Sequence, residues 1–101
     1  MSRKDRVSLA IHCLVAQLWL CDQVSVRARA LTNIETMRRA NTDGTAAVYL
    51  AAWSHLLDGP TEQLIMTLTS PDERARDLRN VTPFAGVVPD EQRRELVHSV
   101  Q

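Results

Sequence analysis

Glycine, proline and aromatic residues are scarce in this chain of 101 residues, which has three glycines, four prolines and four aromatic side chains. Strands in a sheet are joined by turns rich in glycine and proline, so this scarcity argues against a protein of many short strands. The abundance of alanine, leucine and arginine favours long helices instead. Because the hydrophobic share of 45% and the charged share of 24% are ordinary for globular proteins, we expect a single all-α domain over residues 1–101.

Motifs of catalysis and cofactor binding are also missing. The sequence has no glycine-rich phosphate loop, no Gly-x-Ser-x-Gly and no His-Glu-x-x-His. His12 is next to Cys13, but adjacent residues point to different faces of a helix, so these two do not form a catalytic pair. We interpret all three histidines as structural: His12, His55 and His98. The sequence therefore predicts a protein that is not an enzyme, with no cofactor and no metal site.

Cysteine is limited to Cys13 and Cys21. On one straight helix the two residues would be separated by about 12 Å of rise, which is too far for a disulfide bond. We expect both to be reduced thiols in the core of a cytoplasmic protein.

Charge is balanced overall but unevenly distributed along the chain. Residues 1–40 carry seven basic and three acidic side chains, whereas residues 41–101 carry five basic and nine acidic ones. The favoured interpretation is that a basic helical half and an acidic helical half complement each other, within one fold or across a dimer. The alternative is a basic patch that binds an acidic partner or nucleic acid.

The longest apolar stretch runs from Val7 to Cys21. It follows a basic N-terminus, as in a signal peptide, but Asp5 lies in the basic region and His12 and Gln17 interrupt the apolar one. A membrane span also needs about 20 apolar residues. We therefore expect a buried helix from about residue 4 to residue 21 and no membrane span.

Asp22 could end the first helix, cap a second one or lie inside one long helix, since the next segment, residues 22–40, lacks glycine and proline. At helical spacing Val24, Ala28, Leu31 and Ile34 share an apolar arc that should face the core. Two arginines fall near the middle of that arc, namely Arg27 and Arg38. Their stems could simply cover apolar surface, which we favour, or the arc could dock an acidic partner.

The rest of the chain contains the glycine, proline and capping residues that begin and end shorter helices. Residues 45–57 predict a second central helix that packs on the first, with Ala47 and Ala51 as a ridge of small residues. Residues 61–69 predict a short helix after Gly59-Pro60. Ser70 is the expected cap of a helix that ends near residue 79. A loop anchored by Phe84 precedes a last helix that ends near residue 98.

The expected fold is thus a small orthogonal or bundle-like domain of about five helices, in which two long N-terminal segments precede three short helices. Two of the expected helices are apolar on nearly every side, and short helices alone would have to cover that large surface. A second subunit would help to bury it. Our leading hypothesis is a non-catalytic, homodimeric protein-binding or regulatory module. The alternatives are a small DNA-binding regulator that uses the arginines of residues 22–40, and a membrane-associated protein. The candidate partner-binding residues are Arg27, Arg29, Arg38, Arg39, Leu14, Leu18 and Trp19.

Overall fold

The computed structural model describes residues 1–100, which form six α-helices and no strand. The helices are α1 (Arg3–Cys21), α2 (Gln23–Ala40), α3 (Ala47–Asp58), α4 (Thr61–Thr69), α5 (Glu73–Asn80) and α6 (Asp90–Ser99). The expected all-α class is confirmed. The helix count is six rather than about five, because four shorter helices, not three, follow the two long N-terminal helices.

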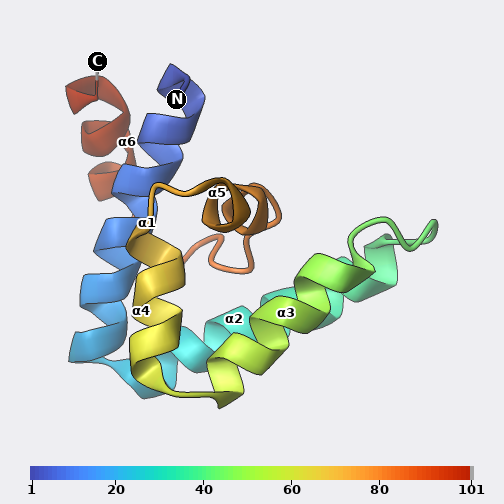
Figure 1. The fold of residues 1–101 in the computed structure, drawn as a ribbon. Helices are drawn as coiled ribbons and strands as arrows, with labels where there is room; N and C mark the ends of the chain where they lie inside the picture. The colour runs from blue at the N-terminus through green and yellow to red at the C-terminus, as the bar shows by residue number, and fades with distance from the viewer. Residues whose placement is uncertain (101) are drawn as a thin grey trace.

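Asp22 makes the break between α1 and α2. Its backbone leaves the helical region, with φ −150° and ψ 73°, while its N–H still donates to the carbonyl of Leu18. Its carboxylate accepts a hydrogen bond from the backbone N–H of Ser25 at 3.2 Å. One residue therefore ends α1 and caps α2, and α2 runs across the end of α1 instead of continuing it (Figure 1).

The helices form a body and an arm (Figure 1). In the body, α1 packs against α2, α4, α5 and α6. The arm consists of α2 and α3, which lie side by side and project away from the body. The expected packing of residues 45–57 on the first helix was wrong, because α3 packs chiefly against α2 and α4.

Aromatic residues join the arm to the loop of residues 81–89, between α5 and α6, which we call the C-terminal loop. Trp53 is fully buried and its indole N–H donates to the carbonyl of Leu78 at 2.9 Å. Phe84 is buried and meets the Trp53 ring edge-to-face, with 5.3 Å between ring centroids. The expected anchoring of the loop by Phe84 is confirmed. The other largest fully buried side chains are Trp19, Ile34, Leu50, Leu57, Leu64, Leu68, Val15 and Pro83.

The apolar arc predicted for α2 was wrong. Val24 is 80% exposed and Leu31 is 41% exposed, whereas Val26, Ala30 and Ile34 are buried. Two apolar faces overlap at Ile34 on this helix, and the sequence pattern does not distinguish them. The buried face also carries Asn33, whose side-chain amide donates hydrogen bonds to carbonyls of the C-terminal loop.

The predicted cap of α5 also needs correction. Asp72, not Ser70, is the N-cap, and its carboxylate accepts from the N–H of Ala75 at 2.7 Å. The Ser70 hydroxyl instead accepts from the N–H of Asp72 at 3.2 Å. Both residues are good cap formers, and their contacts place the start of the helix two residues further along the chain.

The cysteines are free, as expected, but only one of them lies near the core. Cys13 is half-buried, whereas Cys21 is exposed at the end of α1. Cys21 therefore differs from the expected core thiol, because the last two residues of α1, Leu20 and Cys21, are both exposed.

Candidate functional site

The four arginines singled out in the sequence do not form one patch, because two of them are engaged within the arm. The Arg27 guanidinium donates to the carbonyl of Leu57 at 2.7 Å and forms an ion pair with Asp58. Arg39 forms an ion pair with Glu35, one helical turn earlier, at 3.2 Å. Both pairs are largely exposed, so each contributes little to the free energy of folding.

Arg29 and Arg38 project to different sides of α2. Arg38 donates to the hydroxyl of Ser54 on α3 at 3.2 Å. Arg29 reaches the C-terminal loop, where its Nε lies 3.5 Å from the carbonyl oxygen of Ala85. Among the described residues neither arginine forms an ion pair within 4 Å. Arg38 therefore reaches across to α3, Arg39 is paired along α2, and Arg29 lies apart from both.

The three apolar residues proposed as an interface lie on the body. Trp19 is 2% exposed and belongs to the core, so in this fold its ring cannot reach a partner. Leu18 is half-buried against the same core. Leu14 is half-buried and borders a hollow between α1 and α6. Helices of the same chain cover Trp19 almost fully but Leu14 and Leu18 only in part.

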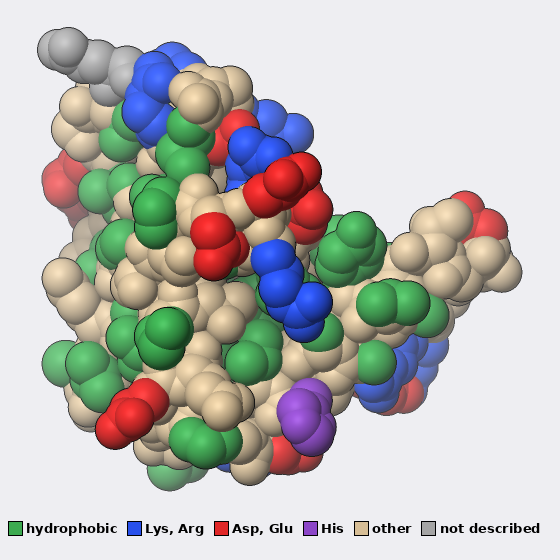
Figure 2. Space-filling view, in the orientation of Figure 1, with side chains coloured by type: hydrophobic (Ala, Val, Ile, Leu, Met, Phe, Trp, Pro, Cys, Tyr) green, Lys and Arg blue, Asp and Glu red, His purple; other side chains and the backbone are tan. Residues whose placement is uncertain are grey.

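An exposed apolar surface does exist on the arm, where the sequence pattern had suggested core. We call it the outer face and define it by Val24, Ala28 and Leu31 on α2 and by Ala47 and Ala51 on α3, all of which are exposed. Figure 2 shows Lys and Arg side chains gathered along one edge of the arm. The two helices thus present small and medium apolar side chains to solvent, on the arm that also carries the exposed Arg38 and Arg39.

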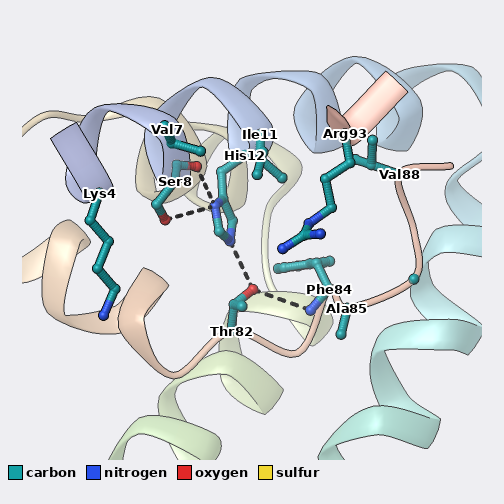
Figure 3. A pocket seen from close by; sticks show the side chains of 11 residues that line it. Lys4, Val7, Ser8, Ile11, His12, Thr82, Phe84, Ala85, Val88 and Arg93 are labelled. Atoms are coloured by element: carbon teal, nitrogen blue, oxygen red, sulfur yellow. Dashed lines mark hydrogen bonds between the residues drawn. The ribbon is translucent and has the colours of Figure 1, made fainter. Parts of the chain in front are cut away.

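A second feature is a cavity of about 300 Å³ between the first half of α1, the loop of residues 82–88 and the start of α6. We call it the α1–loop cavity (Figure 3). Its lining comes from three segments: Lys4, Val7, Ser8, Ile11 and His12, then Thr82, Phe84, Ala85, Gly86 and Val88, and finally Arg93.

His12 forms the polar part of the cavity wall, and all its hydrogen-bonding capacity is used. Its Nδ1 lies 2.7 Å from the carbonyl oxygen of Ser8, which can only accept, so Nδ1 carries the proton. Its Nε2 lies 2.8 Å from the Thr82 hydroxyl and accepts from it. The same hydroxyl oxygen accepts from the N–H of Phe84 at 3.2 Å. This chain of hydrogen bonds fixes the ring (Figure 3).

The chain of hydrogen bonds requires a neutral imidazole. The pKa of His12 is lowered to about 4, chiefly by burial and in smaller part by the positive charge of Arg79, while the hydrogen bond to Ser8 acts in the opposite direction. At neutral pH His12 is therefore uncharged. Its structural role in the sequence interpretation is consistent with this geometry, and it offers the cavity neither charge nor a free lone pair.

Two polar residues that the sequence did not single out hold the elements in place. The Asn33 amide donates to the carbonyls of Pro83 at 2.7 Å and Ala85 at 2.8 Å, so it joins α2 to the C-terminal loop. Its one sequence signal is a polar side chain at helical spacing among the residues that prove to be buried.

The other such residue is Arg79, which is 2% exposed. It donates to the carbonyls of Thr67 at 3.0 Å and Ser70 at 2.7 Å, so it closes the C-terminal end of α4. A cation at a helix C-terminus is favoured by the helix dipole. Nothing in the local sequence distinguishes Arg79 from the exposed arginines around it.

Within residues 1–100, no three histidine, cysteine or acidic side chains come close enough together to hold a metal ion. No helix in the same range has both the length and the apolar character to cross a membrane. Comparisons with known protein families, curated proteins and solved structures found no match to this chain.

Proposed function

We propose that this protein is a non-catalytic binding module that uses the outer face of its arm to hold an acidic, amphipathic helix of a partner protein. The observation that carries the proposal is the exposure of Val24 and Leu31, at 80% and 41%, on a helix whose opposite side already fills the core. Apolar side chains at this helical spacing on a free surface are typical of helix-in-groove recognition.

The shape of the outer face suits a helix. Ala28 lies between Val24 and Leu31 on α2, and Ala47 and Ala51 are exposed on the neighbouring α3. Small residues allow the backbone of another helix to approach closely, while the larger pair would supply the apolar contacts. A partner helix with apolar residues three and four positions apart would match this arrangement.

The charge on the arm favours an acidic partner over a second copy of this chain. Arg38 has no carboxylate partner among the described residues, and Arg39 shares an exposed ion pair with Glu35. A two-fold dimer through α2 would bring a second set of these arginines to the same interface. An acidic helix would instead complement them and associate faster at low ionic strength.

The fold weakens the reason for expecting a dimer. A second subunit would help if α1 lacked cover, but α2, α4, α5 and α6 of the same chain surround it. The DNA-binding alternative relied on four arginines acting together. Arg27 and Arg39 are paired with acids and Arg29 lies apart, so no observation favours that function.

The test is capture of partners from an extract of the native host, with three baits compared by quantitative mass spectrometry. The baits are the wild type, the double variant Val24→Glu/Leu31→Glu, and the control Val48→Glu/Met66→Glu. The control alters two apolar residues that are also exposed, at 77% and 68%, but lie outside the outer face. We expect a protein retained by the wild type and the control and lost from the Val24/Leu31 variant.

The captured protein should contain an acidic amphipathic helix, and a synthetic peptide of that helix should bind more weakly as salt rises. Identical capture by all three baits would contradict the proposal. A wild-type dimer in light scattering that Val24→Glu/Leu31→Glu dissociates would also contradict it, since the occupant would then be a second copy of the chain.

A further inference from the structure

The α1–loop cavity is lined by apolar side chains on one part of its surface and by cations on another. Val7, Ile11, Phe84 and Val88 supply the apolar part, and Lys4 and Arg93 supply the charges. In Figure 3, Lys4 and Arg93 lie on opposite sides of His12, and the Arg93 guanidinium extends toward the ring pair of His12 and Phe84. The volume of about 300 Å³ is at the small end of the range for ligand pockets.

The two cations have no internal counterpart. In the part of the chain that the structure describes, every ion pair within 4 Å involves Arg27, Arg39 or Arg76, and no acidic side chain lines the cavity. Lys4 and Arg93 also make no side-chain hydrogen bond among these residues. Other long cations of the chain are engaged by carbonyls, as Arg3 is by Val97 at 2.6 Å.

The remaining polar groups of the wall do not compete for a ligand. Both nitrogens of His12 are occupied by Ser8 and Thr82, and the Thr82 hydroxyl is also engaged by Phe84. Gly86 adopts φ +81° with the Arg29 guanidinium against it, which fixes the loop edge and adds positive charge nearby. The cavity is therefore pre-formed, apolar within, and positive where it opens.

We propose that the α1–loop cavity binds a small monocarboxylate with an apolar body, such as a medium-chain fatty acid. The guanidinium of Arg93 can take the carboxylate in the two-pronged geometry that arginine favours. Lys4, on the far side of His12 (Figure 3), adds positive charge at a distance, and the hydrocarbon part lies against Ile11 and Phe84. This site is separate from the outer face, so its test does not depend on the partner proposed above.

The test uses octanoate as the probe, followed by amide chemical shifts of the ¹⁵N-labelled protein. We expect saturable shifts confined to residues 7–12 and 82–93, at concentrations where the shifts of α3 do not change. Octan-1-ol has the same chain without the charge and should bind at least about tenfold more weakly. Equal affinity for the acid and the alcohol, or no shift at millimolar octanoate, would overturn the proposal.

Arg93 has a matched control next to it on α6. Arg94 carries the same charge on the same exposed helix but does not line the cavity. We expect Arg93→Gln to weaken octanoate binding by about tenfold, Lys4→Gln to weaken it less, and Arg94→Gln to leave it unchanged. Circular dichroism should show all three variants to be folded, because these side chains are exposed. An equal loss of octanoate affinity in Arg93→Gln and Arg94→Gln would mean that binding depends only on net charge, and would overturn the proposed site.

Discussion

His12 shows how a single side chain in an apolar stretch can be structural without being inert. It interrupts the sequence of α1, yet it is 4% exposed and joins α1 to the C-terminal loop through Thr82. The edge-to-face contact with Phe84, at 6.2 Å between centroids, holds the ring on its other side. The fold therefore depends on the protonation state of one buried imidazole.

We expect the free energy of unfolding to fall on acidification because of His12. The unfolded chain takes up a proton near pH 6.5, whereas burial keeps folded His12 neutral until its pKa of about 4. Stability is thus lost as the pH falls through this window, by about 3 kcal/mol in total. Urea titrations from pH 7 to pH 4 check this result. His12→Gln should remove most of the slope, and the exposed His55→Gln should retain it.

A comparison of two glycines isolates the contact made by Arg29. Gly44 and Gly86 both have positive φ, +74° and +81°, but only at Gly86 would an added Cβ clash with the Arg29 guanidinium. Gly44→Ala should cost about 1 kcal/mol through backbone strain alone. Gly86→Ala should cost more, because the guanidinium must leave the Ala85 carbonyl. Thermal unfolding in an Arg29→Ala background should make the two costs equal; a persistent difference would refute this explanation.

At the scale of elements, helix ends were easier to predict than helix faces. The bounds of α4, Thr61–Thr69, coincide with the expected range, since Pro60 and the Ser70-Pro71 pair act on their immediate neighbours. The start of α5 was misplaced by two residues because Ser70 and Asp72 are both suitable caps. The hydrogen bond from Ala75 lowers the pKa of Asp72, as expected for an ionised cap.

The assignment of this cap can be tested by substitution. Asp72→Ala removes the acceptor of the Ala75 N–H and should lower the Tm by about 5 °C. Ser70→Ala leaves that bond in place and should lower the Tm less. Differential scanning calorimetry of both variants gives the comparison. A larger effect of Ser70→Ala would restore Ser70 as the N-cap.

At the scale of the whole molecule, the arm and the C-terminal loop depend on each other. Asn33 holds two loop carbonyls, and Trp53 reaches the end of α5 through Leu78. These bonds join segments far apart in the sequence. They also determine which face of α2 turns inward, and therefore which residues remain on the outer face.

We expect Asn33→Ala to destabilise the protein by about 2 kcal/mol, because two loop carbonyls lose their donor. Thr32→Ala is the neighbouring control, since Thr32 is exposed on α2 and its hydroxyl makes no hydrogen bond within residues 1–100. It should change stability by less than about 0.5 kcal/mol. Urea unfolding followed by tryptophan fluorescence measures both; equal losses would contradict the role of Asn33.

The sequence by itself determined the all-α class, the approximate helix bounds and the burial of Phe84. Each follows from local features: few turn residues, caps and prolines at helix ends, and a lone aromatic residue in a loop. Only the tertiary structure decided which face of α2 is buried, where the four arginines lie, and that α1 and the loop enclose a cavity. These depend on contacts between distant residues, such as Asn33 with Pro83, and helical periodicity carries no information about them.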